Sequence, residues 1–301
     1  MNHKQTSKVP FSIWIAAFSG LVFIIIISDY FHENYKPVET ESSSLAGFEP
    51  ERLKNIHNNG LIVVGTSLVQ YGFPYDDEFE TLAKKKGITI EFIRFSRSSG
   101  KPPDFEILGD AILNSKPRWV FLQAEPFFLD MHRTFSYQWL EHLRNNVHFL
   151  LEQIIIETNF LNTDCNPVYQ NDLNLRLDEV ATIEIIKNER IQYLIKPPVF
   201  SEYFESFLKQ AKENNIKVIL LEMNRSKEGN EYFGKAFRAQ LNKTLQQVSK
   251  HYQIPLWQFR SDLSLNYYVD RAHLNRKGRA VFSDWFLSKL AQDAQEKNHN
   301  D

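Results

Sequence analysis

The stretch LIVVGT, residues 61–66, decides the fold class. It is a continuous apolar run that stops at a glycine, as expected of a strand buried on both faces. Strands of this kind belong to parallel sheets that carry helices on both sides. The fold class therefore depends on whether strands and helices alternate along the rest of the chain.

They do alternate. Four further segments have strand signals, at residues 88–95, 119–123, 217–223 and 254–259. Helices are predicted at residues 76–86, 104–114, 201–214, 233–251 and 276–294. Five strands that alternate with helices predict an α/β domain with a parallel five-stranded sheet covered on both faces, over residues 53–301.

One region interrupts the alternation. Residues 137–160 are apolar at helical spacing, and residues 161–198 show no clear pattern. We interpret residues 126–200 as a helical insertion into the domain.

The N-terminal region carries a candidate membrane anchor. Residues 9–28 (VPFSIWIAAFSGLVFIIIIS) have no charged side chain, and about 20 helical residues cross a hydrocarbon core of ~30 Å. Lys4 and Lys8 precede this span, which predicts a cytoplasmic tail at 1–8 and an extracytoplasmic domain, in a bacterial periplasm or on the outer face of the plasma membrane. A cleaved signal peptide is the alternative, but no small-x-small cleavage site follows the apolar run. The polar residues 29–52 predict a tether.

A serine follows the first strand. Ser67 lies at the carboxyl end of that strand, where α/β sheets present reactive groups. The helix that follows would offer backbone N–H groups to a developing oxyanion. The alternative is that Ser67 caps this helix, which is a common role for a serine in this position.

Asp270 and His273 lie three residues apart, just before the last helix. A turn of helix-like backbone brings such a pair into contact, so that the carboxylate holds the imidazole tautomer and the other ring nitrogen accepts a proton from Ser67. Asp-x-x-His is also common as a surface pair. A parallel sheet, however, brings residues after its first and last strands to one rim, so the combination predicts a Ser–His–Asp triad.

At these two blocks the sequence resembles the SGNH (GDSL) hydrolases. Residues 65–68 (GTSL) are similar to the Gly-Asp-Ser-Leu block of that family, and residues 270–275 (DRAHLN), followed by Gly278, are similar to its final Asp-x-x-His block. The resemblance implies a flavodoxin-like three-layer α/β/α fold and ester hydrolysis or acyl transfer on oxygen. It also implies that Ser67 is the nucleophile, His273 the base and Asp270 the residue that orients the base.

The middle of the sequence departs from the family pattern, which places a Gly after strand two and a Gly-x-Asn after strand three as oxyanion donors. Gly100 or a nearby serine amide could serve at the first position. Glu125 occupies the Asn position, where an ionised carboxylate would oppose an oxyanion; alternatively it is an ordinary loop carboxylate. Gln123 could donate through its side-chain amide instead. Loss of one donor can cost ~10²–10³ in rate.

Composition excludes several other functions. The chain has 301 residues with a formal net charge of −2, which lacks the basic footprint of a nucleic-acid-binding protein. Its single cysteine, Cys165, excludes an intramolecular disulfide and Cys-cluster metal sites. The histidines of the soluble part other than His273 are scattered without ligand spacing, so we predict no metal site and no cofactor.

The anchored SGNH-like architecture is similar to accessory proteins of surface-polymer acylation, such as those of teichoic-acid D-alanylation and alginate acetylation. This resemblance implies a membrane-bound O-acyltransferase as partner and an acyl ester or a carbohydrate polymer as substrate. The sequence thus predicts a membrane-anchored serine esterase or O-acyltransferase of the cell envelope. The alternative is a catalytically inactive SGNH-like scaffold that binds a polymer or a membrane acyltransferase.

Overall fold

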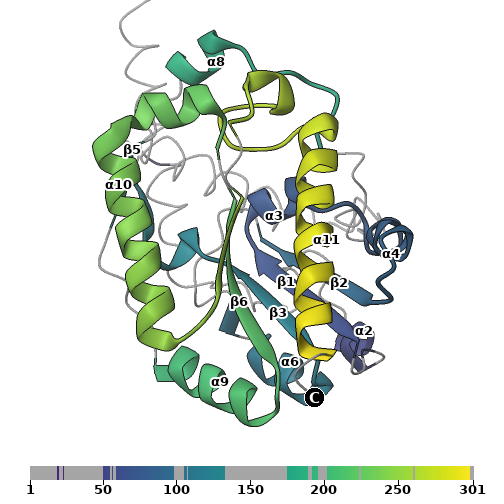
Figure 1. Cartoon of the computed structure of the whole chain (residues 1–301). Coiled ribbons are helices and arrows are strands. Elements are labelled where there is room, and N and C mark those ends of the chain that lie inside the picture. The colour runs from purple at the N-terminus through teal and green to yellow at the C-terminus, as the bar shows by residue number, and fades with distance from the viewer. Residues whose placement is uncertain are drawn as a thin grey trace, which may run out of the picture. The chain divides into compact units, whose positions relative to one another are not determined.

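The computed structural model of the chain describes residues 19, 23, 50–54, 56, 59–97, 105–106, 108–132, 175–188, 192–195, 202–223, 225–259 and 262–298. The chain divides into two units, Met1–Glu41 with Arg133–Asn166, and Ser42–His132 with Pro167–Asp301. All described residues except 19 and 23 belong to the second unit, and Figure 1 labels many of its helices and strands.

A five-stranded parallel sheet forms the centre of this unit. Its strands are β1 (Gly60–Gly65), β2 (Glu91–Ser96), β3 (Trp119–Gln123), β6 (Lys217–Met223) and β7 (Leu256–Phe259). They lie in the order β2-β1-β3-β6-β7, and every neighbouring pair is parallel. When these five strands are renumbered 1 to 5 along the chain, the order is the flavodoxin-like 2-1-3-4-5. The second strand lies on one side of β1 and the later strands lie on the other, so the strand order reverses between β1 and β3. The predicted α/β fold with a parallel five-stranded sheet is therefore confirmed.

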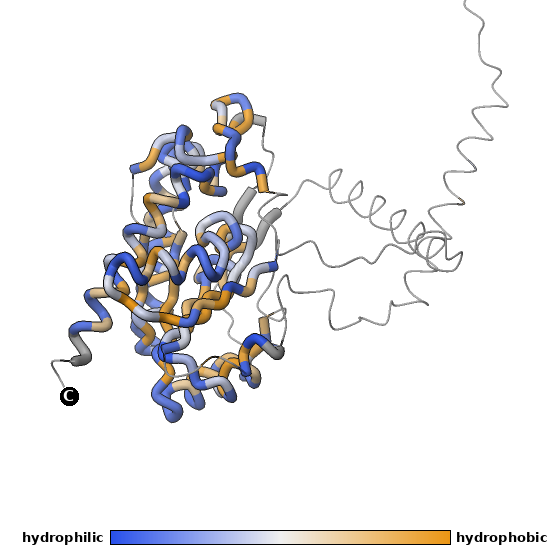
Figure 2. The backbone as a smooth tube through the Cα atoms, turned by 90° about the vertical axis from the view of Figure 1, so that its right-hand side faces the viewer, coloured by the Kyte–Doolittle hydropathy of each residue, from blue (hydrophilic) through white to orange (hydrophobic). Residues whose placement is uncertain are grey.

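Helices cover both faces of the sheet. Alternate residues of β1 enter two different hydrophobic clusters, Leu61 and Val63 in one and Ile62 and Val64 in the other. The first cluster contains side chains of α3 (Ser67–Gly72), α4 (Asp76–Lys85) and α11 (Arg276–Asn298). The second contains side chains of α2 (Pro50–Lys54), α6 (Gly109–Ser115), α9 (Glu202–Glu213) and α10 (Lys227–Tyr252). Figure 2 shows hydrophobic residues recurring between hydrophilic ones along these elements.

Aromatic packing fixes the helices of the first face. Phe73, directly after α3, lies 5.0–5.7 Å, ring to ring, from four other phenylalanines: Phe79, Phe92, Phe282 and Phe286. Each such pair adds about 0.5–1.5 kcal/mol beyond area burial. These contacts join α3, which carries Ser67, to α4, β2 and α11.

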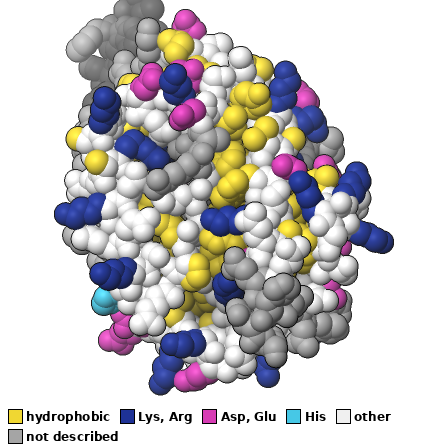
Figure 3. Space-filling model, viewed as in Figure 1, with side chains coloured by type: hydrophobic (Ala, Val, Ile, Leu, Met, Phe, Trp, Pro, Cys, Tyr) yellow, Lys and Arg dark blue, Asp and Glu magenta, His cyan; other side chains and the backbone are white. Residues whose placement is uncertain are grey.

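The edge of the sheet at β7 is also aromatic. Figure 3 shows a band of hydrophobic side chains on the face of the molecule that carries α10 and α11 in Figure 1. Lys289 lies over the rings of Trp257 and Trp285, at 5.0 and 5.7 Å from their centroids. Its aliphatic stem can cover apolar surface there while its charge faces the aromatic rings.

Several element boundaries differ from the sequence-based expectation, and two of them have a clear local cause. Strand β2 begins at Glu91 rather than at residue 88, because α4 ends in a turn in which Gly87 has a φ of 77° and the Ile88 amide bonds back to Ala83. Helix α10 begins at Lys227, six residues before the predicted start, because Ser226 caps an additional helical segment by accepting from the Gly229 amide, and a kink at Gly234 (φ 80°) joins this segment to the predicted helix.

The predicted helical insertion is only partly helical in the described residues. Helix α8 (Ile183–Asn188) lies within it, but β4 (Leu129–His132) and β5 (Gln192–Ile195) form a two-stranded antiparallel sheet. The expected helix at 137–160 lies outside the described residues. The predicted anchor at 9–28 also lies outside them, apart from residues 19 and 23, and so does almost all of the tether. Within the described residues, no helix is both long and apolar enough to cross a membrane.

Candidate active site

Ser67 is the first residue of α3, which starts directly after β1. The helix is capped by Thr66, whose Oγ1 accepts a hydrogen bond from the Leu68 amide at 3.4 Å. The capping role that was the alternative for Ser67 is thus taken by its neighbour. The Ser67 hydroxyl lies instead 2.8 Å from Nε2 of His273. The site stands after β1, where the strand order reverses and α/β sheets bind their ligands.

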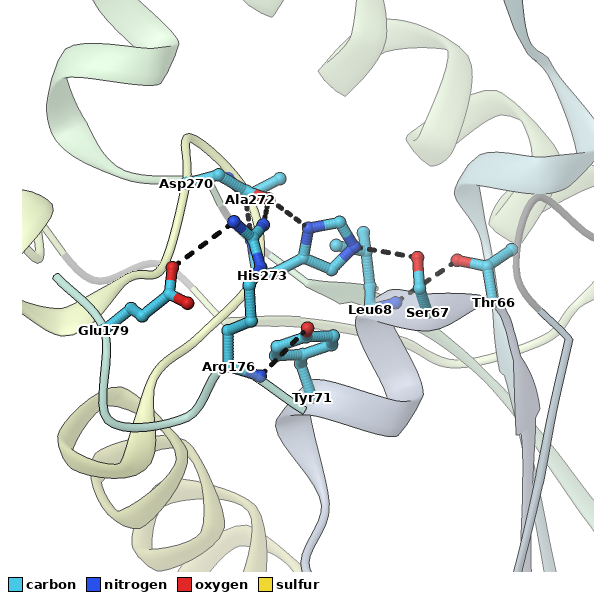
Figure 4. A network of polar contacts seen from close by, with 9 residues as sticks. All are labelled: Thr66, Ser67, Leu68, Tyr71, Arg176, Glu179, Asp270, Ala272 and His273. Atoms are coloured by element: carbon cyan, nitrogen blue, oxygen red, sulfur yellow. Dashed lines mark hydrogen bonds and ion pairs between the residues drawn. The ribbon is translucent and has the colours of Figure 1, made fainter. Parts of the chain in front are cut away.

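The other ring nitrogen of His273 contacts Asp270. Nδ1 lies 2.7 Å from Asp270 Oδ2, and Asp270 Oδ1 accepts from the backbone N–H groups of Ala272 and His273, both at 2.8 Å. Figure 4 shows Ser67, His273 and Asp270 in a continuous chain of contacts. The three predicted triad residues are therefore brought together from the two ends of the domain.

The surroundings of Asp270 keep it ionised. Burial by itself would raise the pKa of this carboxyl, but the hydrogen bonds from His273 and Ala272 and the charge of His273 together lower the pKa to about 2. An ionised Asp270 can accept Nδ1–H of a neutral His273, which leaves Nε2 to accept the Ser67 O–H. This arrangement can make the serine hydroxyl a nucleophile.

Gln123 supports the residue that precedes the serine. Its Oε1 accepts from both the amide and the hydroxyl of Thr66, at 2.7 and 2.9 Å. A Cβ at Gly65 would lie 2.6 Å from Gln123 Oε1 and would also collide with Val69, so only glycine fits there. Gln123 was predicted as an oxyanion donor; the structure places its side-chain oxygen at Thr66, next to Ser67.

Glu125, predicted at the Asn position of the family, contacts the backbone of β6. Its side chain is 3% exposed, and Oε1 accepts from the Met223 amide at 3.3 Å, at the end of β6. No hydrogen bond joins it to Ser67, Asp270 or His273, all of which are described. Burial is the main cause that raises its pKa to about 7, against the opposing charge of Arg225. The place of Glu125 at the oxyanion position stays a prediction, and its burial distinguishes it from a solvent-exposed loop carboxylate. The other predicted donor, Gly100, lies outside the described residues.

Two buried arginines hold the end of α3. Arg279 of α11 donates from Nε to the Tyr71 carbonyl at 2.9 Å and from Nη2 to the Gln70 carbonyl at 3.0 Å. Arg94 of β2 donates to the carbonyls of Gln70 and Phe73. The last carbonyls of a helix have no hydrogen-bond partner within the helix, and here the two charged arginine side chains donate to them. The helix that carries Ser67 is thus fixed from two sides.

Sequence reasoning missed three residues around His273. The Tyr71 ring lies 4.7 Å from the imidazole, Arg176 lies beside Asp270, and Glu179 pairs with Arg176 (Figure 4). Tyr71 could have been found, because it is four residues after Ser67 and so on the same side of α3. The other two fall in the stretch without a pattern. Among the described residues, no group of three His, Cys, Asp or Glu side chains could hold a metal ion.

Comparison with known proteins finds fold-level likenesses only. No protein-family model matches the chain, and no curated protein does. Among solved structures, the chain is similar to a GDSL-like lipase from Bacteroides thetaiotaomicron, with 15% identity, 87% of this chain and 98% of that chain covered, and a TM-score of 0.38. The esterase EstA from Pseudoalteromonas sp. has 11% identity, coverage of 79% and 100%, and a TM-score of 0.40. A variant of Axe2, an acetyl-xylooligosaccharide esterase from Geobacillus, has 13% identity and a TM-score of 0.42, with 79% of this chain and 96% of that chain covered. At these TM-scores, the function has to be argued from the site itself.

Proposed function

We propose that this chain is a serine hydrolase of the SGNH type, an esterase or O-acyltransferase that acts on a carbohydrate or polymer of the cell envelope. The observation that carries the proposal is the hydrogen-bonded chain from Ser67 through His273 to Asp270. It stands at the carboxyl edge of a parallel sheet, and its residues belong to the two sequence blocks that resemble the SGNH family.

The reaction follows from this geometry. Ser67 Oγ attacks the carbonyl carbon of an ester, and its proton moves to His273 Nε2. The C–O bond to the leaving alcohol then breaks, the alcohol oxygen takes the proton from Nε2, and an acyl-Ser67 ester remains. Water or a sugar hydroxyl next attacks the acyl carbon and gives its proton to Nε2. The bond to Ser67 breaks, and the proton returns to Oγ.

The developing oxyanion needs donors beside Ser67. The backbone N–H of Ser67, at the first position of α3, is one candidate. The amide nitrogen of Gln123 is the second, because the hydrogen bonds of Oε1 to Thr66 hold that side chain next to the nucleophile. Gly100 is the third candidate donor, and only the resemblance to the family supports it.

The place of action is proposed from the sequence. The uncharged segment 9–28 and the lysines before it support a single-pass anchor with the hydrolase domain outside the cytoplasm. A membrane-bound O-acyltransferase would be the partner at the same surface. Protease added to intact spheroplasts should digest the domain; survival of the domain until the membrane is lysed would contradict this topology.

A fluorophosphonate probe tests the enzyme proposal, because it reacts with activated serines. The full-length protein should be labelled, and Ser67→Ala should abolish labelling. Ser206→Ala, at an exposed serine of α9, is the matched control and should be labelled like the wild type. A wild-type protein that is not labelled, or a Ser67→Ala protein that is, would contradict the proposal, and the first result would favour the inactive scaffold.

A further inference from the structure

A segment in the second half of the predicted insertion, called the return segment here, is bound to the loop that carries Asp270 and His273. The backbone of this return segment, residues 175–181, makes three hydrogen bonds with that loop and with Arg276 at the start of α11. They run from Arg276 N to Leu177 O at 2.8 Å, from Ala181 N to Tyr268 O at 2.8 Å, and from Asn275 Nδ2 to Glu179 O at 3.2 Å. The backbone of the return segment is therefore fixed beside the triad.

The return segment places a cation next to the triad carboxylate. Arg176 Nη2 lies 3.9 Å from Asp270 Oδ2, the same oxygen that lies 2.7 Å from His273 Nδ1. Arg176 Nη1 also donates to Glu179 Oε2 at 3.3 Å. In Figure 4 the guanidinium lies between these two carboxylates. The positive end of the Arg176–Glu179 pair thus faces Asp270.

Arg176 is not needed to orient Asp270. The other oxygen of that carboxylate, Oδ1, is already held by the backbone N–H groups of Ala272 and His273. The backbone N–H of Arg176 itself donates to the Tyr71 hydroxyl at 3.5 Å, so a side-chain substitution can keep that contact. What the guanidinium adds beside Asp270 is its charge.

Few groups face the imidazole of His273 in the described residues. Its own loop supplies Asp270 and α3 supplies Ser67 and Tyr71, while the return segment adds Arg176 beside Asp270 and Glu179 beside Arg176. Of these, Arg176 is the cation within 4 Å of the Asp270–His273 hydrogen bond. Glu179, of opposite charge, binds the same guanidinium.

We propose that Arg176 is a positioning residue of the hydrolase, one that acts through Asp270 to oppose protonation of His273, and that Glu179 limits this effect. The inference rests on the proposed function. A cation beside Oδ2 weakens the attraction between the carboxylate and a protonated imidazole. The base form of His273 then remains available to Ser67 at lower pH. Because the Arg176 side chain is 53% exposed, solvent and salt screen part of the effect.

The pH dependence of fluorophosphonate labelling of the full-length protein tests this role. Arg176→Gln should move the acid limb of the profile to higher pH by about half a pH unit at low salt. Glu179→Gln should move it in the opposite direction, since it leaves the cation uncompensated. Arg176→Lys should stay near the wild type, and both shifts should shrink in 1 M salt, where the Debye length is about 3 Å.

Lys85→Gln is the matched control for the loss of one positive charge. Lys85 is exposed at the end of α4, and the chain from there enters β2 at the amino edge of the sheet, opposite Ser67. Its profile should coincide with that of the wild type. If Arg176→Gln and Glu179→Gln leave the acid limb in place, or move it in the same direction, the proposal is wrong.

A second readout separates this proposal from the proposed function. The NMR signal of the His273 imidazole, assigned with His273→Gln, can be followed against pH without turnover or labelling. The same opposite displacements in Arg176→Gln and Glu179→Gln are expected there. An unlabelled wild-type protein would contradict the hydrolase, whereas unmoved imidazole signals would contradict the role of Arg176.

Discussion

Gln123 and Thr66 are joined by two hydrogen bonds to one atom: Gln123 Oε1 accepts from both the amide and the hydroxyl of Thr66. Gln123 ends β3, and Thr66 directly follows the neighbouring parallel strand β1. Thr66 in turn caps α3 through the Leu68 amide. The buried glutamine thereby fixes the turn on which Ser67 stands.

Replacement of this glutamine should therefore affect stability and reactivity together. Gln123→Leu leaves the Thr66 donors without their acceptor, which should lower the free energy of unfolding by about 1–3 kcal/mol. Labelling of Ser67 should slow as well. Urea denaturation and the labelling rate measure the two effects. Gln246→Leu, at an exposed glutamine of α10, should change neither by much. Wild-type stability in Gln123→Leu would show that the turn does not depend on this residue.

The end of α3 should depend on Arg279. Arg279→Met removes two charged donors from the carbonyls of Gln70 and Tyr71, which we expect to cost about 2–3 kcal/mol in urea denaturation. The control is Arg276→Met, because the Arg276 side chain is 67% exposed and its partner Asp178 is 81% exposed. That change should cost less than about 1 kcal/mol. Equal losses in the two variants would contradict this account of the helix end.

Glu125 should make stability depend on pH. Its pKa is raised to about 7 by burial, so the folded protein holds the proton more tightly than the unfolded chain does. The stabilisation by this proton is complete below about pH 4.5 and is lost as the pH rises through about 7. Glu125→Gln should therefore be more stable than the wild type at pH 8, by roughly 3 kcal/mol, and similar to it at pH 4.

The control for this comparison is Glu213→Gln, at an exposed glutamate of α9. Unfolding measured from pH 4 to pH 8 should show no comparable change relative to the wild type. If the stability difference between Glu125→Gln and the wild type were constant over this range, the buried carboxyl would not titrate in it.

The sequence was most informative where a pattern is local. Strands β3 and β6 have the predicted bounds, because each is a short apolar run between turn signals. The contact of Ser67 with Asp270 and His273 could be predicted, because parallel strands bring their carboxyl ends to one edge of the sheet. The sequence could not predict that Thr66 rather than Ser67 caps the helix. A shift of one residue in the start of α3 would exchange the two roles, and helix starts are not predicted that accurately.

The remaining misses concern contacts between segments far apart in the chain. Glu125 follows β3 directly, and the contact of its carboxyl with the backbone of β6 was not predicted. The pairing of β4 with β5 and the contact of Arg176 with Asp270 each involve a residue or strand of the stretch 161–198, which shows no clear pattern in the sequence. No local propensity encodes such contacts.

The central claim is that Ser67 and His273 act as one unit, and a double-mutant cycle on hydrolysis of a small acyl ester tests it most directly. Ser67→Ala and His273→Ala should each remove nearly all of kcat/KM, and the double variant should be little worse than either, because a base without its nucleophile has nothing to activate. Asp270→Asn should cost no more than these, since it disturbs the tautomer and leaves the nucleophile in place. Modest losses that add up in the double variant would mean that the two residues act independently, and would contradict the triad.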